Sequence, residues 1–182
     1  QRQMCIRDRF MMLKNKVAIV TGGTRGIGFA VVKKFIENGA AVSLWGSRQE
    51  TVDQALEQLK ELYPDAKISG KYPSLKDTAQ VTAMINQVKE EFGAVDILVN
   101  NAGITKDGLL MAMSEADFDD VIDTNLKGCF QMIRFASRRM MKQRYGRIIN
   151  VSSVSGVAGN AGQANYCASK AGMIGLTKSA AK

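Results

Sequence analysis

The chain has 182 residues, 46% of them hydrophobic and 23% charged, which is typical of a globular domain. It has no histidine, which excludes Ser-His triads and histidine-ligated metal sites, and Cys5, Cys129 and Cys167 form no CxxC pair. The net charge of +8 suits an acidic partner, but neither a nucleic-acid motif nor an apolar run of bilayer length accompanies it. We expect a cytoplasmic protein with reduced cysteines, and no metal, nucleic acid or membrane as partner.

The two ends of the sequence differ from the rest. Residues 1–10 are polar and arginine-rich without periodicity, so we interpret them as a non-native leader before a single domain that covers 11–182. A short disordered extension is the alternative. At the other end, a helical pattern stops at Lys182 without a cap or a breaker, which predicts a domain truncated at its C-terminus.

The first half of the chain alternates apolar strand patterns with helical patterns. A buried strand is predicted at 17–20, a helix that ends at Asn38-Gly39, a strand at 41–45 and a helix up to Leu62. A weak third strand follows at Ile68. Ser74 to Asp77 resembles a capping box that opens the next helix.

The second half continues the alternation. We predict strands at 95–99 and 147–151, separated by one long helix that Ser114 caps and that runs to about Met141. A loop at 156–162 then leads to a final helix from about Ala164. This order predicts an α/β fold, a doubly wound parallel sheet with helices on both faces.

A glycine-rich loop, TGGTRGIG, stands between the first strand and its helix. Glycines there allow a tight turn and a close approach of the backbone to a phosphate, and the helix start offers free N–H groups. The strand-loop-helix context therefore predicts a Rossmann-type, NAD(P)-binding domain. The expected cofactor-binding residues of this loop are Gly22, Thr24, Arg25, Gly26, Ile27 and Gly28.

The end of the second strand selects between the two nicotinamide cofactors. An acidic residue there binds the ribose of NAD, whereas this sequence has Gly46, Ser47 and Arg48. Arg48 and Arg25 can clamp a 2′-phosphate, so we predict NADPH (NADP⁺) as the cofactor and place Ser47 in its site. The alternative is that both arginines only solubilise the surface.

A serine, a tyrosine and a lysine form the candidate catalytic group. Tyr166 and Lys170 are four residues apart, so both side chains point to one side of a helix. A lysine ammonium beside a phenol favours the phenolate, which suits a residue that gives and takes a proton. Ser153, 13 positions before Tyr166, can hold a substrate oxygen against the phenol, and Ser152 competes for this role.

Together, TGGTRGIG, NNAG, Asn125, Ser153 and the Tyr166-x-x-x-Lys170 pair resemble the short-chain dehydrogenase/reductase family. The resemblance implies that Tyr166 is the acid, that Ser153 binds the carbonyl, and that Lys170 binds the nicotinamide ribose and polarises the tyrosine. It also implies that Asn125 kinks the long helix and holds a water of a proton relay. Asn100, Ala102 and Gly103 would line the adenine side and brace the central strand.

Within the family, segments such as 104–110 and 159–166 most resemble bacterial 3-oxoacyl-[acyl-carrier-protein] reductases. This implies NADPH-dependent reduction of a 3-oxoacyl thioester in type II fatty acid synthesis. It also implies a homotetramer whose interface includes the helices after Ser114 and Gly162, and an acidic carrier protein docked beside the active-site mouth on Arg144, with Arg138 and Arg139 nearby. A solvated basic helix face is the alternative for these arginines.

Two features depart from that subfamily. The aspartate that often follows the third strand and touches adenine is absent from Gly70 to Ser74, so that contact is not expected. The segment 39–75, and LKELYP at 59–64 above all, resembles hydroxysteroid (bile acid) dehydrogenases of gut bacteria. Oxidation or reduction of a hydroxysteroid or another secondary alcohol is therefore the alternative function, and an inert fragment or a binding scaffold is a third reading.

Overall fold

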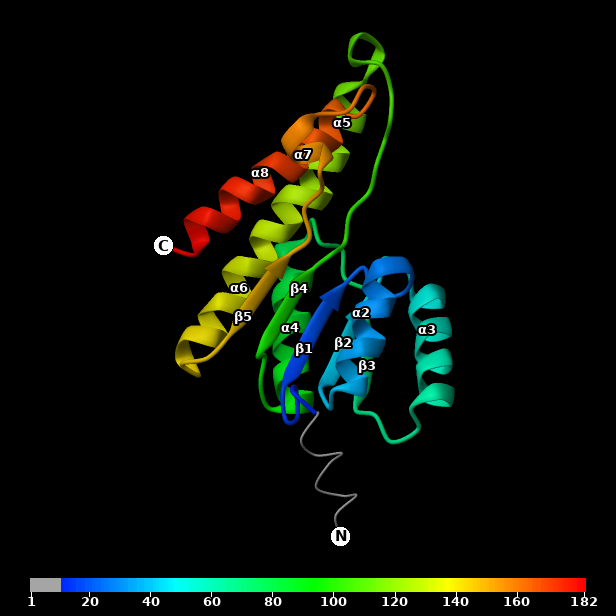
Figure 1. Cartoon of the computed structure of the whole chain (residues 1–182), viewed down its shortest axis with the longest axis vertical. Coiled ribbons are helices and arrows are strands. Elements are labelled where there is room, and N and C mark those ends of the chain that lie inside the picture. The colour runs from blue at the N-terminus through cyan, green and yellow to red at the C-terminus, as the bar shows by residue number, and fades with distance from the viewer. Residues whose placement is uncertain (1–10) are drawn as a thin grey trace.

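Residues 11–182 are described by a computed structural model, in which a parallel sheet carries helices on both faces (Figure 1). The strands are β1 (Val17–Thr21), β2 (Ala41–Trp45), β3 (Ile68–Lys71), β4 (Ile97–Asn100) and β5 (Arg147–Asn150). The helices are α2 (Gly26–Glu37), α3 (Gln49–Leu62), α4 (Thr78–Phe92), α5 (Glu115–Ile122), α6 (Gly128–Lys142), α7 (Ser155–Ala158) and α8 (Ala164–Ala180), with a 3-10 turn η1 (Leu110–Ala112) and a π turn η2 (Asp123–Lys127). The leader predicted at 1–10 lies outside the described residues.

The strand order of the sheet is β3-β2-β1-β4-β5, and all neighbouring strands are parallel. The chain builds outward from β1 to β3, returns, and continues from β4 to β5 on the other side of β1. The predicted doubly wound parallel sheet is therefore confirmed. Thr21 and Asn100 are paired at the carboxyl ends of β1 and β4, where the winding direction reverses. In open α/β sheets this reversal leaves a crevice that binds ligands.

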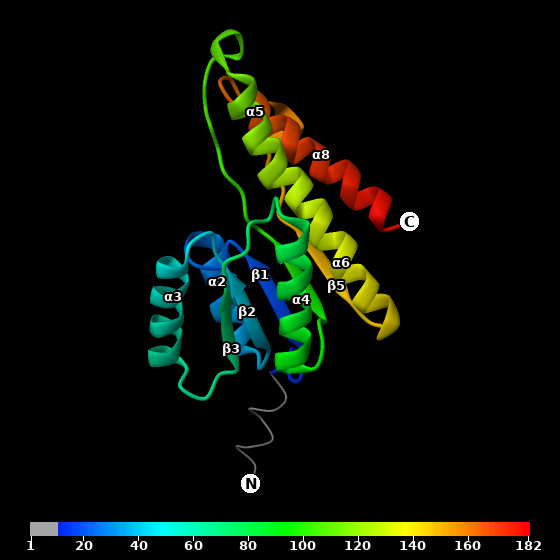
Figure 2. The same ribbon diagram turned by 180° about the vertical axis from the view of Figure 1, so that it is seen from behind.

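Two apolar cores hold the sheet between its helices (Figures 1 and 2). Val20 and Val32 belong to the core on the face of α2 and α3, whereas Ile19 and Ile85 belong to the core on the face of α4 and α6. Neighbouring residues of β1 thus serve opposite faces, because side chains alternate along a strand. Burial on both sides explains why this strand is continuously apolar, as predicted from the sequence.

The start of α4 differs from the prediction. Asp77, rather than Ser74, is the N-cap, and its carboxylate accepts hydrogen bonds from the backbone N–H groups of Ala79 and Gln80. The capping box is therefore shifted by three residues: the Gln80 side chain bonds back to the Asp77 carboxylate and accepts the N–H of Ser74. The sequence contains both patterns, and the structure uses the second one.

The long helix predicted from Ser114 to Met141 is divided into α5, η2 and α6. Ser114 caps it as expected, since its hydroxyl accepts the N–H of Asp117. The interruption is the π turn, a feature that often occurs at functional sites. The loop predicted at 156–162 is also partly wrong, because it begins within the short helix α7.

Beyond the carboxyl edge of the sheet, the chain forms a second layer of structure. There α7 and the beginning of α8 lie beside α5, and the segment after β4 extends past them to η1 (Figures 1 and 2). None of the helices between residues 11 and 182 combines the length and the apolar character that a bilayer crossing needs.

Candidate active site

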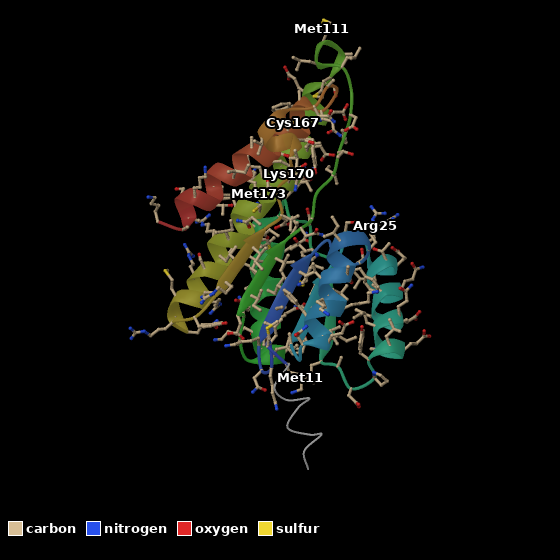
Figure 3. The ribbon with its side chains drawn as sticks, in the orientation of Figure 1. Met11, Arg25, Met111, Cys167, Lys170 and Met173 are labelled. Carbon is tan, nitrogen blue, oxygen red and sulfur yellow. The ribbon has the colours of Figure 1, made fainter. Side chains whose placement is uncertain are left out.

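The residues singled out in the sequence come from six segments at one edge of the sheet. The glycine-rich loop follows β1, Ser47 and Arg48 follow β2, the NNAG segment begins at the last residue of β4, and Ser153 follows β5. Asn125 lies in η2, and Tyr166 and Lys170 lie on α8. Arg25 and Lys170 are both at this end of the sheet, opposite Met11 (Figure 3). The fold therefore brings the predicted cofactor-binding and catalytic residues to the same edge.

The glycine-rich loop leaves no room for side chains at two of its positions. A Cβ on Gly28 would lie 2.0 Å from the carbonyl oxygen of Gly22, and a Cβ on Gly22 would lie 2.9 Å from the Asn101 side chain. Gly22 and Gly26 also have left-handed backbones, with φ of 64° and 55°. At Gly26 a Cβ would meet no atom within 4 Å, so the loop is open on the side of that residue.

The start of α2 fits an anionic group. Its N-cap, Arg25, makes no capping hydrogen bond with its side chain, and the first turn contains no acidic residue. The N–H groups of this turn and the positive end of the helix dipole are thus available to a phosphate. A tight glycine cradle that leads into such a helix fits the pyrophosphate of a dinucleotide, and Ile27, 68% exposed, lies on its outer side.

The loop after β4 braces the glycine-rich loop. The Asn101 side chain donates to the carbonyl oxygens of Thr21 and Gly22, each at 3.2 Å, and the N–H groups of Asn101 and Ala102 donate to the Thr21 hydroxyl. Asn101 was not among the predicted site residues, although it stands within the motif that supplied three of them. It fixes the cradle, and only the contacts across 80 residues of sequence reveal this role.

Asn100 has a different orientation from its neighbour. Its amide donates to Asn150 of β5 at 2.8 Å, and Asn150 in turn donates to Thr177 of α8. The side chain is 3% exposed, so it joins β4 to β5 beneath α8 rather than lining an open surface. Within residues 11–182, its Oδ1 is a buried side-chain oxygen with no hydrogen-bond partner.

Two arginines stand at the ends of β1 and β2. Arg25 and Arg48 are the N-cap residues of α2 and α3, and both are exposed, as is Ser47. The two loops touch each other, because a Cβ on Gly46 would lie 2.7 Å from the methyl group of Thr24. The segment 45–48 has no carboxylate, and its close contact with Thr24 places it beside the phosphate cradle.

Lys170 is the most deeply buried of the charged candidates. It is 4% exposed, and its ammonium donates to the carbonyl oxygen of Val151 at 2.8 Å. The ammonium lies 5.7 Å from the centre of the Tyr166 ring, which confirms that the two side chains share one side of α8. Burial lowers the pKa of Lys170 from its ordinary value, because desolvation disfavours the charged form.

Asn125 lies in the π turn and is 1% exposed. Its side chain donates to the carbonyl oxygen of Ile104 and accepts the N–H of the same residue, at 2.9 and 2.8 Å, and also donates to the Ser169 hydroxyl. A Cβ on Gly103 would lie 3.3 Å from Asn125 Oδ1 and 3.7 Å from Lys170 Nζ. Gly103 therefore lets these two polar groups approach one another.

The two serines after β5 make different contacts. The hydroxyl of Ser152 donates to the carbonyl oxygen of Lys170 at 2.8 Å, which ties this loop to α8. The hydroxyl of Ser153 accepts the N–H of Ser155 at 3.2 Å, a contact that does not use its proton. Ser153 can still donate to a substrate oxygen, whereas Ser152 has a structural partner.

The predicted docking arginines lie at the opposite end of the molecule. Arg138 and Arg139 belong to the last turns of α6, and Arg144 lies in the short turn between α6 and β5, so all three are near the amino edge of the sheet. Ser153 and Lys170 lie at the carboxyl edge. Within one chain these arginines are not beside the candidate active site. Arg138 and Arg139 instead line a hollow between α4 and α6, together with Ile85 and Phe135.

A second hollow, between η1 and α5, is lined by Leu110, Met113 and Phe118, near the exposed side chains of Leu109 and Met111. It contains no candidate catalytic residue. Across residues 11–182, acidic and cysteine side chains form no group that could hold a metal ion.

Comparison with known proteins identifies the family. The family described as short chain dehydrogenase matches residues 16–182. The chain is 68% identical over 173 residues to the 3alpha-hydroxysteroid dehydrogenase of Mediterraneibacter gnavus, which covers 95% of the chain and 69% of that protein. It is 50% identical over 173 residues to the 3-oxoacyl-[acyl-carrier-protein] reductase FabG of Staphylococcus aureus, covering 94% of the chain and 69% of that protein.

Solved structures agree with this result. The crystal structure of an NAD⁺-bound xylitol dehydrogenase has a TM-score of 0.89 and 31% identity, over 93% of this chain and 65% of the other. Levodione reductase gives the same TM-score with 33% identity, over 93% of this chain and 66% of the other. The chain thus spans about two thirds of the length of the proteins it resembles.

Proposed function

The chain belongs to the short-chain dehydrogenase family of oxidoreductases, which act on alcohols and ketones, and we propose that it interconverts a 3-hydroxysteroid and the 3-ketosteroid with NADP(H). The observation that carries the reaction type is the convergence of Tyr166, Lys170 and Asn125 beside the glycine cradle. The substrate rests on the 68% identity to a 3alpha-hydroxysteroid dehydrogenase, which was the alternative in the sequence analysis.

The cofactor is held by the cradle after β1 and by the ends of β2 and β4. When bound, it supplies or accepts the hydride at the substrate carbon. The preference for NADP(H) is supported by the exposed Arg25 and Arg48 and by the lack of a carboxylate at 45–48. An arginine pair binds a phosphate through charge-assisted hydrogen bonds, whereas a carboxylate at this point would repel it.

In the proposed mechanism, Tyr166 donates a proton to the substrate oxygen during reduction and removes it during oxidation. Ser153 donates a second hydrogen bond to the same oxygen, so that the two hydroxyls share the charge that develops there. The ammonium of Lys170 stabilises the tyrosinate and, because burial lowers its pKa, gives up a replacement proton more readily than an exposed lysine. Asn125 fixes the backbone at Ile104 next to this ammonium.

A second candidate substrate is a 3-oxoacyl group on an acyl carrier protein, which the sequence analysis favoured. The 50% identity to FabG and the basic end of α6 support it. Because Arg138, Arg139 and Arg144 are remote from Tyr166 in one chain, this candidate needs a homo-oligomer, such as the predicted homotetramer, to bring a partner's arginines to the site.

The surface of α5 and α6 supports such an assembly. The amino end of α5 carries the exposed Glu115 and Asp119, and the last turns of α6 carry Arg138 and Arg139, with Phe130 half-exposed between the two ends. Two copies that pack antiparallel would join opposite charges and cover the apolar middle, which is the self-complementarity that a two-fold interface requires.

Cofactor oxidation by the protein as its gene encodes it tests the substrate. We expect fast turnover with a 3-ketosteroid and NADPH, slower turnover with NADH, and little with an acetoacetyl thioester of acyl carrier protein. Turnover of the thioester alone would favour the second candidate. Failure with every ketone, together with no NADPH binding, would contradict the proposal.

A further inference from the structure

Asn165, the residue before Tyr166, makes contacts that the proposed mechanism does not yet use. It is 0% exposed, although asparagine is rarely buried without hydrogen bonds. Its Oδ1 accepts the backbone N–H of Tyr166 at 2.7 Å. Its Nδ2 donates to the carbonyl oxygens of Lys106 and Asp117, at 2.9 and 3.3 Å.

The three partners belong to three separate parts of the chain. Lys106 is in the loop after β4, Asp117 is in α5, and Tyr166 is in the first turn of α8. One side chain therefore joins the backbone of the tyrosine to two segments that are 48 and 59 residues away in sequence. An ordinary helix cap would satisfy the N–H alone and would not need the amide donors.

The same loop is tied to α8 by further contacts. Gly108 donates its N–H to the carbonyl oxygen of Gly162 at 2.8 Å, and the Gln163 amide donates to the Asp107 carboxylate at 3.1 Å. At the other end of the loop, Asn125 holds Ile104 and the hydroxyl of Ser169. Two buried asparagines, Asn125 and Asn165, thus hold this loop at both ends. Both also contact the part of α8 that carries Tyr166.

We propose that Asn165 is a positioning residue that sets the location of the Tyr166 phenol relative to Lys170 and the substrate oxygen. The proposal rests on the proposed function, in which Tyr166 transfers the proton. Proton transfer requires the phenol within hydrogen-bond reach of the substrate oxygen, and a misplacement of about 1 Å costs roughly 100-fold in rate. A side chain that bonds the tyrosine backbone to two other elements limits such displacement.

The Asn165→Asp substitution tests this role, because it keeps the shape and the acceptor but removes both donors. Gln131→Glu is the matched control: Gln131 is 4% exposed, accepts a hydrogen bond from Thr78 and donates to the carbonyl oxygen of Lys76, away from the site. Both variants exchange a buried amide for a carboxylate. Asn165→Ser, a neutral change, is the second variant in case the carboxylate prevents folding.

We expect kcat for ketone reduction to fall about 100-fold in Asn165→Asp and less in Asn165→Ser, with KM and NADPH affinity changed less than threefold. The solvent deuterium isotope effect on kcat should increase, because donation by Tyr166 then limits the rate. Gln131→Glu should lose stability but keep the kcat and the isotope effect of the parent protein.

Three results would overturn the proposal. Unchanged kcat in a folded Asn165→Asp or Asn165→Ser variant would do so. A fall in kcat without a larger isotope effect would show that Asn165 only supports the fold. Loss of NADPH binding in both variants would show the same. Tyr166→Phe distinguishes a failure of this proposal from a failure of the proposed function. If Tyr166→Phe is inactive, only the role of Asn165 is refuted. If Tyr166→Phe still reduces the ketone, the assignment of Tyr166 is wrong as well.

Discussion

The two sides of the molecule differ in the contacts that hold them together. On the cofactor side, β1, β2, α2 and α3 pack through aliphatic side chains such as Leu44 and Leu59, both fully buried. On the catalytic side, a small apolar cluster that includes Ile133 and Met173 joins α6 to α8. Buried polar residues, Asn125, Asn165 and Lys170, are added to this packing above the sheet.

This difference separates the part of the molecule that binds the cofactor from the part that transfers the proton. Apolar packing is not directional, so it supports a rigid platform beneath the glycine cradle, which the hydrogen bonds of Asn101 hold in place. Hydrogen bonds are directional and hold a phenol and an ammonium at defined positions, but each buried donor or acceptor is costly when its partner is lost. Substitutions on the two sides should therefore have different consequences.

The largest effect expected on the cofactor side comes from Gly28→Ala. Its Cβ would lie 2.0 Å from the backbone oxygen of Gly22, so the cradle must shift, and NADPH affinity should fall roughly 100-fold because the phosphate contacts are displaced. Energy transfer from Trp45, the single tryptophan, to the bound reduced cofactor measures the affinity. Gly175→Ala in α8, where a Cβ meets nothing within 4 Å, is the control and should leave affinity unchanged. Unchanged NADPH affinity in Gly28→Ala would contradict the assignment of the glycine-rich loop as the phosphate-binding site.

A pair of substitutions compares the two sides directly. Leu59→Ala should lower the free energy of unfolding by about 2–5 kcal/mol while the folded enzyme keeps its kcat, since only apolar packing is lost. Asn125→Leu leaves the N–H and carbonyl of Ile104 without their partner, at about 1–3 kcal/mol each, and should also abolish most of the turnover. Urea unfolding and steady-state kinetics give both quantities. Equal changes of kcat in Leu59→Ala and Asn125→Leu would contradict the distinction between the cofactor side and the catalytic side.

The smallest effect concerns the ion pairs that join α5 to Lys106, in the loop after β4, and to Lys76, in the segment before α4. Hydrogen bonds donated by Lys106 lower the pKa of Asp117, and those donated by Lys76 and Lys106 lower the pKa of Asp120. The same bonds to Asp117 and Asp120 raise the pKa of Lys106. Carboxylates with lowered pKa values stabilise the fold above their unfolded pKa of about 3.9, and this contribution is lost as the pH falls through the lower folded values.

Asp120→Asn should therefore shift the urea midpoint downward at pH 7 by a small amount, because the pairs are largely exposed. The difference from the parent protein should shrink as the pH is lowered below about 4. A difference that stays constant down to pH 2 would show that the charges of these pairs contribute nothing.

The sequence predicted the cofactor side better than the catalytic side. The apolar run of β1 and the glycine spacing are local patterns, and they gave the strands, the sheet and the cradle. Asn101 and Asn165 were not predicted as important, because their role depends on partners 48 to 80 residues away. The same limit applies to the arginines of α6, whose position relative to Tyr166 depends on the fold. Asp77 differs, since it caps α4 in place of Ser74 through contacts with Ala79 and Gln80 that are local in sequence.

The substrate depends on a different kind of information. The two proteins with the highest identities quoted above, a hydroxysteroid dehydrogenase and a 3-oxoacyl-[acyl-carrier-protein] reductase, are named for different substrates although this chain resembles both over the same length. The LKELYP segment at 59–64 belongs to α3 and its end, on the β2–β3 side of the molecule and away from α8 (Figure 1). The LKELYP segment therefore indicated which proteins this chain is related to, and not which residues contact the substrate.

The most direct measurement compares cofactor binding with turnover in Tyr166→Phe, made in the protein as its gene encodes it. The cradle and the proton donor come from different sides of the molecule, so NADPH should bind with unchanged affinity, seen as energy transfer from Trp45. Ketone reduction should fall by about 100-fold or more, the contribution expected of a general acid. Turnover close to that of the parent protein would contradict the assignment of Tyr166. Loss of NADPH binding would show that the two sides do not act separately.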